Sequence, residues 1–250
     1  MHRALVTGAG KRLGRAMALY LAGRGFDVAV HYATSRAAAE ETASDIIAQG
    51  QRTSLLQANL LDEAETQALL PRAAAALGGP ITCLVNNASI FEADNIHTAT
   101  AESWERHIGS NLRAPFVLTQ AMAAQGLQAT SDDRSEPRAT GLIVNMIDQR
   151  VLSLTPEFMS YTIAKMGLWA MTRSTAQALA PAIRVNGIGP GPTLQGQHQT
   201  EEVFAQERRD TVLERGVNLE DITATLGYFL DAPAITGQLI CPDGGEHLKW

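Results

Sequence analysis

A tyrosine and a lysine four residues apart have the types and spacing that best fit acid–base chemistry in this chain. On a helix, Tyr161 and Lys165 would lie on the same face. An ammonium group stabilises a tyrosinate and lowers a phenol pKa that starts near ~10, so such a tyrosine can donate a proton near neutral pH. The same spacing also occurs in solvated pairs on many helices, so the rest of the chain must decide between the two interpretations.

A carboxylate precedes this pair in a position suited to ligand chemistry. Asp148 follows the apolar run 142–144, which is typical of a buried strand. Open parallel α/β sheets bind their ligands at the carboxyl ends of strands. We therefore expect Asp148 either to feed a proton to Tyr161, to hold a polar ring, or simply to cap the end of the strand.

A glycine-containing turn, residues 7–14, lies between an expected strand over 4–6 and a helix that begins near Leu13. A strand, a glycine turn and a helix together present backbone N–H groups to a pyrophosphate. The glycine spacing departs from G-x-G-x-x-G, and an ordinary tight turn would also use these glycines. We nevertheless predict a dinucleotide site here.

The segment after the second expected strand, 28–30, indicates which dinucleotide binds. An acidic residue that would accept the ribose hydroxyls is absent from it. The cations Lys11, Arg12 and Arg36 are expected nearby and would favour a 2′-phosphate. This pattern predicts NADPH rather than NADH, unless Arg36 merely begins a solvated helix.

Strands and helices alternate along the chain, which is typical of right-handed βαβ crossovers. We predict a single Rossmann-type α/β domain over residues 1–250, with a doubly wound parallel sheet flanked by helices on both faces. The polar segment 128–140 is predicted to be a mobile loop, and 193–210 a lid over the substrate. The remaining expected strands are 54–58, 81–85, 183–188 and 237–241, and the remaining expected helices are 37–49, 63–77, 101–126 and 219–230.

Composition excludes several classes of function. The chain has 250 residues and a net charge of −6, which argues against nucleic-acid and polybasic membrane surfaces. Cys83 and Cys241 fit buried inert thiols, and the sequence has no zinc-ligand spacing, so we expect no metal. With no signal peptide and no bilayer-spanning run in the sequence, we expect a cytoplasmic enzyme.

Taken together, these residues resemble the short-chain dehydrogenase/reductase family over nearly the whole chain. The resemblance implies a Rossmann domain, usually a homotetramer, with Asn111, Tyr161 and Lys165 as catalytic residues. The motifs that match, in the family's order, are Thr7-Gly8, Asn86-Asn87-Ala88, Asn111, Tyr161-x-x-x-Lys165, Pro190-Gly191 and Asp243-Gly244-Gly245.

Two departures from the family pattern resemble its pteridine reductase branch. Asp148 stands where the family has serine, and Arg12 replaces the second glycine of the turn. The branch motifs present here are Thr-Gly-x-x-Lys-Arg-Leu-Gly (7–14), His31-Tyr32, Asn-Asn-Ala-Ser-x-Phe (86–91) and Asn-Met-x-Asp (145–148) thirteen residues before Tyr161. Thr34 stands where the branch has an arginine near the 2′-phosphate.

The branch implies a flat pterin site. There Phe91 would sandwich the pterin against the nicotinamide, Ser89 would contact the pterin, and Arg12 would reach both phosphate and pterin. An aromatic face with hydrogen-bonding groups at its edges suits such a bicycle. Phe91 could instead pack a loop, and Ser89 could cap a turn.

The sequence therefore predicts an NADPH-dependent reductase of a pterin or dihydropterin. Asp148, Tyr161, Lys165 and Asn111 would be catalytic, and Asn111 would position a water in a proton relay. Alternatives are a carbonyl reductase of 3-oxoacyl or sugar ketones, and a silent NADPH-binding regulator. Substrate contacts are expected from Arg12, Ser89, Phe91, Asp148 and Tyr161. Cofactor contacts are expected from Gly8, Lys11, Arg12, Leu13, His31, Tyr32, Ser35, Asn59, Leu60, Asn87, Ala88, Ser89, Tyr161, Lys165, Pro190 and Gly191.

Overall fold

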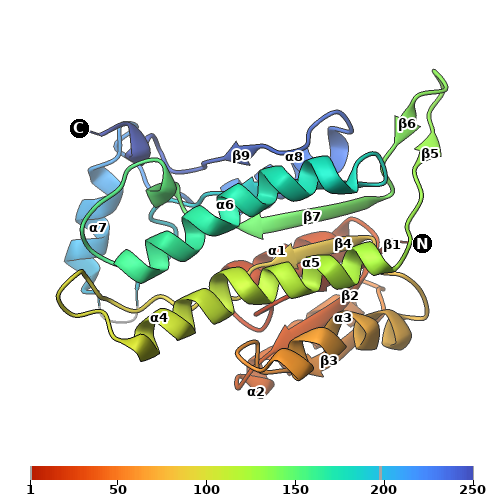
Figure 1. The fold of residues 1–250 in the computed structure, drawn as a ribbon, viewed down its shortest axis with the longest axis horizontal. Helices are drawn as coiled ribbons and strands as arrows, with labels where there is room; N and C mark the ends of the chain where they lie inside the picture. Colours follow the sequence, from red (N-terminus) through yellow and green to blue (C-terminus); the bar gives the residue numbers. More distant parts are fainter. Residues whose placement is uncertain (1, 197–198, 250) are drawn as a thin grey trace.

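A seven-stranded parallel sheet forms the centre of the molecule, with helices on both of its faces (Figure 1). The structure is a computed structural model that describes residues 2–196 and 199–249. Its strand order is β3-β2-β1-β4-β7-β8-β9, which confirms the predicted doubly wound sheet. The strands are β1 His2–Val6, β2 Phe26–Tyr32, β3 Thr53–Gln57, β4 Cys83–Asn86, β7 Gly141–Met146, β8 Ile183–Ile188 and β9 Leu239–Ile240.

Two helical layers cover this sheet. Helices α1, α2 and α8 pack on one face, and α3, α5 and α6 pack on the other. The helices are α1 Arg12–Gly23, α2 Arg36–Ala48, α3 Glu63–Leu77, α4 Ala101–Ile108, α5 Ala114–Ala124, α6 Met159–Leu179, α7 Glu201–Arg209 and α8 Leu219–Asp231.

The six longer strands of the sheet, β1, β2, β3, β4, β7 and β8, contribute side chains to both of the larger hydrophobic cores. In β1, Ala4 and Val6 join the core that contains Met17 of α1, whereas Leu5 joins the core that contains Leu118 of α5. Successive side chains of a strand point to opposite faces, so a strand covered on both sides reads as a continuous apolar run. This is why the strands were recognisable in the sequence.

The expected helix over 101–126 is interrupted. Between α4 and α5 the chain forms a π-helical turn, Gly109–Arg113, which contains the buried Asn111. Single π-helical turns inside helices are frequent at functional sites. A mid-helix asparagine was the only sign of this turn in the sequence.

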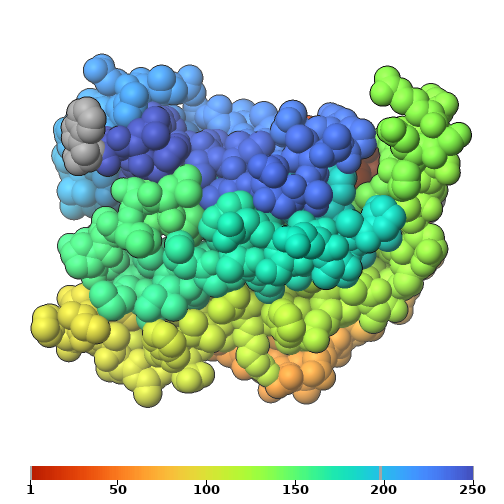
Figure 2. Space-filling model, turned by 45° about the horizontal axis from the view of Figure 1, so that its top comes forward, coloured from red at the N-terminus to blue at the C-terminus, as the bar shows by residue number. Residues whose placement is uncertain are grey.

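Two polar segments contain regular structure that was not predicted. The segment 128–140 forms a short antiparallel hairpin, β5 Thr130–Ser131 with β6 Pro137–Arg138, which projects from the body (Figures 1 and 2). The predicted lid, 193–210, contains helix α7, and its residues 197 and 198 lie outside the described residues. The mobility of both segments stays a prediction. Within the described ranges, none of the helices has the length and apolarity that a membrane crossing requires.

Candidate active site

Asp148 and Tyr161 form a hydrogen-bonded pair at the carboxyl end of the sheet. Asp148 follows β7 and opens a short 3-10 turn, in which its Oδ1 accepts a hydrogen bond from the Arg150 N–H at 2.9 Å. Its Oδ2 accepts a hydrogen bond from the Tyr161 hydroxyl at 2.7 Å. The carboxylate therefore joins the end of β7 to the first turn of α6.

The pKa of Tyr161 is raised well above its ordinary value. Burial is the main cause, followed by the Asp148 carboxylate, whose charge and hydrogen bond both favour the neutral phenol. The lowering of this pKa that we expected from Lys165 does not outweigh burial and the Asp148 carboxylate, so the net shift is upward. The ammonium lies 5.5 Å from the Tyr161 ring centroid, and its Nζ donates to the Met146 carbonyl oxygen at 2.7 Å. The phenol is held protonated, which is the form a proton donor requires.

Lys165 is itself strongly perturbed. Its side chain is 2% exposed, and burial lowers its pKa to about 8, although the Asp148 carboxylate opposes this change. The ammonium is therefore still charged at neutral pH, close to the carboxylate and the phenol.

Asn111 fixes the loop that follows β4. Its side-chain Oδ1 accepts a hydrogen bond from the Ile90 N–H, and its Nδ2 donates to the Ile90 carbonyl oxygen, both at 2.8 Å. This pair holds the loop between Ser89 and Phe91. The expected role of Asn111 in placing a relay water stays a prediction.

Aromatic rings lie beside the Asp148–Tyr161 pair. Phe91 stacks on Phe158 with ring centroids 4.3 Å apart, and meets Tyr161 edge-on at 4.7 Å. Phe91 is 55% exposed, so part of its surface is available to a flat ligand. Ser89 lies within hydrogen-bonding reach of the Tyr161 hydroxyl, and this contact opposes the rise in the pKa of the phenol.

These groups share a cavity of about 990 Å³. It brings together many predicted residues: Arg12, Leu13, Asn87, Ser89, Phe91, Asp148, Tyr161, Lys165, Pro190 and Gly191. It also contains residues that the sequence analysis missed: Gln149, Arg150, Phe158, Phe204, Glu207 and Glu246. Of these, Phe158 could most easily have been found from the sequence. It lies three residues before Tyr161 and is aromatic, as Phe91 is.

The remaining predicted cofactor residues lie outside this cavity lining. Lys11 and Asn59 are exposed, Ser35 precedes α2, and Tyr32 and Leu60 are buried. The N–H of Ala88 donates to the Thr7 hydroxyl at 3.0 Å.

His31 supports the glycine turn from beneath. The Gly8 N–H donates to its Nδ1 at 3.0 Å, so its Nε2 carries the proton and donates to the Ala58 carbonyl oxygen at 3.0 Å. The ring is 1% exposed, and burial lowers its pKa to about 4. His31 was expected to contact the cofactor directly, but both ring nitrogens are engaged with the protein backbone.

The glycine turn has the close packing that a dinucleotide site requires. A Cβ on Gly14 would come within 2.2 Å of the Gly8 carbonyl oxygen, so α1 can approach the turn only with glycine there. The amide of Asn87 ties the same turn to β4 by donating to the Thr7 carbonyl oxygen at 2.8 Å. No side chain caps the N-terminus of α1 at its N-cap residue, Lys11. The first backbone N–H groups of this helix are therefore suited to binding a phosphate.

Arg12 joins the glycine turn to the predicted lid. Its backbone is left-handed, with φ of 53°, the conformation that a glycine would favour at this position. Its guanidinium donates to the carbonyl oxygens of Leu194 at 3.1 Å and Gln195 at 2.9 Å. One residue therefore contributes backbone to the turn and a side chain to the lid.

Arg36 was expected near the 2′-phosphate, unless it merely begins a solvated helix. It is the first residue of α2, is exposed and pairs with Glu40 at 2.8 Å, which agrees with the second alternative. The remaining support for a 2′-phosphate comes from Lys11, Arg12 and the absence of an acidic side chain directly after β2.

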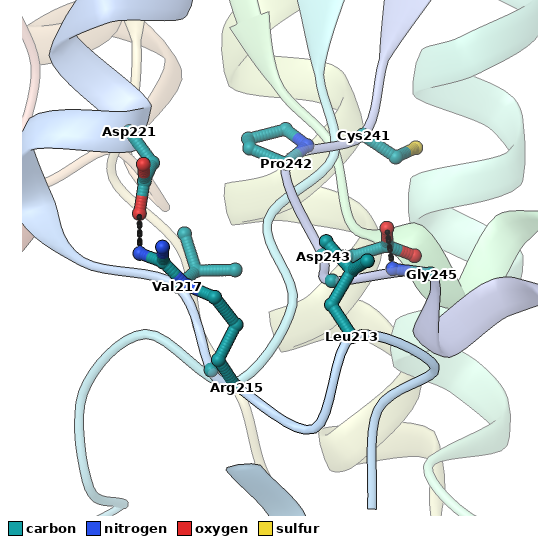
Figure 3. Close-up of a pocket in the computed structure, with 10 residues that line it drawn as sticks. Leu213, Arg215, Val217, Asp221, Cys241, Pro242, Asp243 and Gly245 are labelled. Atoms are coloured by element: carbon teal, nitrogen blue, oxygen red, sulfur yellow. Dashed lines mark hydrogen bonds and ion pairs between the residues drawn. The ribbon is translucent and has the colours of Figure 1, made fainter. Parts of the chain in front are cut away.

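A second cavity, of about 330 Å³, lies beside the C-terminal Asp-Gly-Gly turn (Figure 3). Asp243 is buried there and accepts hydrogen bonds from the N–H groups of Gly245 and His247, both at 2.9 Å. Arg215 on its rim pairs with Asp221 at 3.7 Å. These side chains stabilise the C-terminal turns. Across residues 2–196 and 199–249, no group of three or more metal-ligating side chains is assembled.

Comparison with known proteins identifies the family to which the chain belongs. Residues 2–206 fit the sequence pattern of the short chain dehydrogenase family. The chain belongs to this family, and membership confirms the predicted oxidoreductase class with a nicotinamide dinucleotide cofactor.

Individual relatives cover almost all of the chain. The crystal structure of FolM alternative dihydrofolate reductase 1 from Brucella suis, in complex with NADP, is 40% identical with a TM-score of 0.91, and the match covers 100% of this chain and 96% of that chain. Pteridine reductase 1 of Leishmania tarentolae is 32% identical, over 98% of this chain and 96% of its own length. The 3-oxoacyl-[acyl-carrier-protein] reductase FabG of Staphylococcus aureus is 31% identical, over 98% of each.

Proposed function

We propose that this chain is an NADPH-dependent reductase of a pterin or dihydropterin. The observation that carries this proposal is the Asp148–Tyr161 hydrogen bond beside the partly exposed ring of Phe91. A pterin is a flat ring system with polar edges, so it needs both an aromatic surface and groups that hydrogen-bond at its edge. The FolM and pteridine reductase relatives support the same assignment.

The residues divide the chemistry between them. The cofactor, when bound at the glycine turn, supplies a hydride to a ring carbon of the pterin. Tyr161 donates its hydroxyl proton to the adjacent ring nitrogen, and Asp148 orients that hydroxyl. The charge on Lys165 offsets the tyrosinate that remains until solvent returns the proton. Asn111 holds the Ser89–Phe91 loop and is proposed to position the relay water.

The competing assignment is a carbonyl reductase, supported by the FabG relatives. Ketone reduction builds negative charge on the carbonyl oxygen, and a carboxylate at position 148 would repel that charge. The geometry therefore favours the pterin. A silent cofactor-binding regulator fits less well, because the chain retains the buried tyrosine, lysine and asparagine together.

Steady-state assays of the purified enzyme test the proposal directly. With NADPH, we expect turnover of at least one of dihydrobiopterin, dihydromonapterin and dihydrofolate, at a higher kcat/KM than for acetoacetyl-CoA. Absence of turnover with all three pterins, alongside measurable ketone reduction, would support the carbonyl reductase instead.

We also propose a homotetramer in the cytoplasm. Helices α4, α5 and α6 carry partly exposed apolar side chains, including Trp104, Phe116, Ile163 and Met166, which a second copy could cover. Both cysteines are free, which suits a reducing compartment. Light scattering coupled to size-exclusion chromatography tests the assembly, and a monomeric mass would contradict it.

A further inference from the structure

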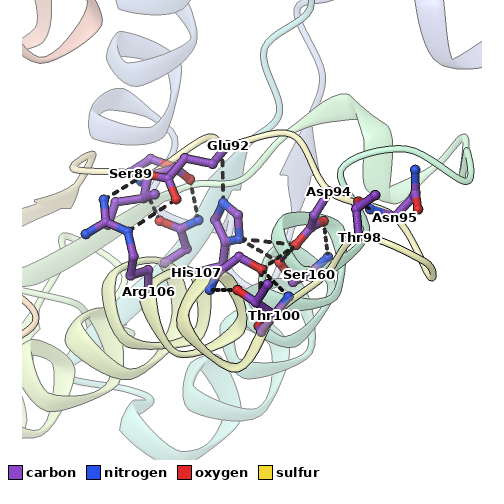
Figure 4. A network of polar contacts seen from close by, with 12 residues as sticks. Ser89, Glu92, Asp94, Asn95, Thr98, Thr100, Arg106, His107 and Ser160 are labelled. Atoms are coloured by element: carbon purple, nitrogen blue, oxygen red, sulfur yellow. Dashed lines mark hydrogen bonds and ion pairs between the residues drawn. The ribbon is translucent and has the colours of Figure 1, made fainter.

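A network of polar contacts, drawn in Figure 4, lies next to Tyr161, whose ring centroid is 6.0 Å from that of His107. It links the loop after β4, helix α4 and the start of α6 through Asp94, His107 and Ser160, all of which are buried. The His107 Nδ1 and the Ser160 Oγ are 2.6 Å apart, and the Ser160 hydroxyl donates to the Asp94 carboxylate. None of these residues lines the substrate cavity.

The direction of each hydrogen bond follows from the donors available. The Glu92 N–H donates to His107 Nε2 at 3.1 Å, so Nε2 carries no proton and Nδ1 must carry it. His107 then donates from Nδ1 to Ser160, and Ser160 donates to Asp94. The hydroxyl lies between the ring and the carboxylate and gives its proton to the carboxylate. It is not activated by the histidine as a hydrolase nucleophile would be.

Asp94, in the loop after β4, caps the N-terminus of α6. The N-cap residue of α6, Phe158, is left-handed with φ of 54° and offers no side-chain cap. Instead, the Ser160 N–H donates to Asp94 Oδ1 at 3.1 Å, and the Met159 N–H donates to the Asp94 carbonyl oxygen at 3.3 Å. A carboxylate at this end of a helix is also favoured by the helix dipole.

Tyr161 directly follows the residue that this network holds. Two hydrogen bonds fix the loop that carries Ser89 and Phe91. The Ile90 N–H donates to Asn111, and the Glu92 N–H donates to His107. The aromatic surface and the phenol therefore come from two segments that meet in the network. A shift of about 1 Å in such an arrangement can lower a rate by ~100-fold.

We propose that Asp94, His107 and Ser160 are positioning residues, which set the Tyr161 hydroxyl against Ser89 and Phe91 for proton donation. The proposal rests on Tyr161 as the proton donor of the proposed reductase, but not on the identity of the substrate. Protonation of His107 would place a hydrogen on Nε2, where it would face the Glu92 N–H, so acid conditions should release the loop.

The charges around His107 modulate this response. Burial lowers the pKa of His107, the carboxylates of Asp94 and Glu92 oppose that change, and Arg106 on the same helix adds to it. The Tyr161 ring faces the imidazole edge-on at 6.0 Å from α6. The neutral, Nδ1-protonated ring is therefore expected to prevail at pH 7.

The first test uses substitutions of His107 and the substrate that the wild type reduces best. His107→Phe keeps the ring shape and loses both nitrogens, so kcat should fall by ~10- to 100-fold while the Kd for NADPH changes less than ~2-fold. His107→Gln offers an oxygen to the Glu92 N–H and an NH₂ group to Ser160. It should recover kcat to within ~3-fold of wild type and remove the acid limb of the kcat profile. His97→Asn, at an exposed histidine of the same loop, is the matched control and should leave the profile unchanged.

The second test needs no substrate. Nitrogen-15 NMR of the wild type at pH 7 should report a neutral His107 with its proton on Nδ1. A proton on Nε2, or a wild-type kcat in His107→Phe, would overturn the proposal. An acid limb that persists in His107→Gln would overturn it as well. Failure of the pterin assignment alone would leave the NMR result and the His107 variants' effect on ketone reduction intact, so the two proposals can be separated.

Discussion

The hydroxyl of Tyr161 and the carboxylate of Asp148 lie 2.7 Å apart, with the phenol donating. This pair keeps the phenol protonated, because a negative charge on the tyrosine would face the carboxylate in a buried site. The tyrosine therefore starts in the protonated form, which is the form that a reductase needs in order to supply a proton.

Replacing Asp148 with serine should shift the substrate preference from dihydropterins toward ketones. We expect Asp148→Ser to lower kcat/KM for a dihydropterin by ~10- to 100-fold and to raise it for a 3-oxoacyl thioester, since a hydroxyl can donate to the developing oxyanion. Asp148→Ala provides neither group and should lose pterin reduction without gaining ketone reduction. Parallel steady-state assays with both substrates measure this, and a loss of existing ketone reduction in the serine variant would contradict it.

The pKa of Lys165 predicts the alkaline limit of activity. Its pKa is lowered to about 8, so its charge is present below that pH and is lost above it. We therefore expect kcat for reduction to fall as the pH rises through about 8. Lys165→Arg keeps the charge to higher pH. If it remains active, it should move this limb upward. A flat wild-type profile between pH 7 and 9.5 would mean that the charge plays no part.

Cofactor preference can be tested at Thr34, an exposed residue after β2. We expect the wild type to prefer NADPH by ~10-fold or more in kcat/KM, because one good charge-assisted contact to the 2′-phosphate supplies about 1.4 kcal/mol. Thr34→Arg should increase that preference, and Thr34→Asp should shift it toward NADH. Equal use of the two cofactors by the wild type would show that Lys11 and Arg12 do not select the 2′-phosphate.

The lowered pKa of His31 predicts that the free energy of unfolding decreases in acid. Its pKa is about 4 in the folded protein against 6.5 unfolded, so the unfolded chain binds more protons between these values. The full contribution of His31 to the free energy of unfolding is present above pH 6.5. About 3 kcal/mol of this free energy is lost as the pH falls from 6.5 through 4. Urea unfolding of the wild type and of His31→Leu across this range measures it. The variant should be less stable at pH 7 by about 1–3 kcal/mol, because the Gly8 N–H loses its acceptor, and its pH dependence should be weaker.

The sheet was predictable from sequence because its strands are covered on both faces and therefore read as continuous apolar runs. The proximity of Tyr161 and Lys165 was predictable because the two residues are one turn apart on one helix. The network around His107 was not, because Asp94, His107 and Ser160 are far apart in sequence and each is unremarkable in its own segment. Nor could sequence foresee the raised pKa of Tyr161, which depends on the 2.7 Å contact and on burial.

The left-handed Arg12 has a consequence for how the affinities of two ligands are coupled. Holding an arginine in that conformation costs about 1–3 kcal/mol, and here its guanidinium reaches the lid carbonyl oxygens of Leu194 and Gln195. A dinucleotide phosphate at the turn would compete for that guanidinium, so if the predicted lid moves, its closure would be coupled to dinucleotide binding. Thermodynamic linkage is reciprocal, so a ligand held beneath the lid must alter dinucleotide affinity by the same factor.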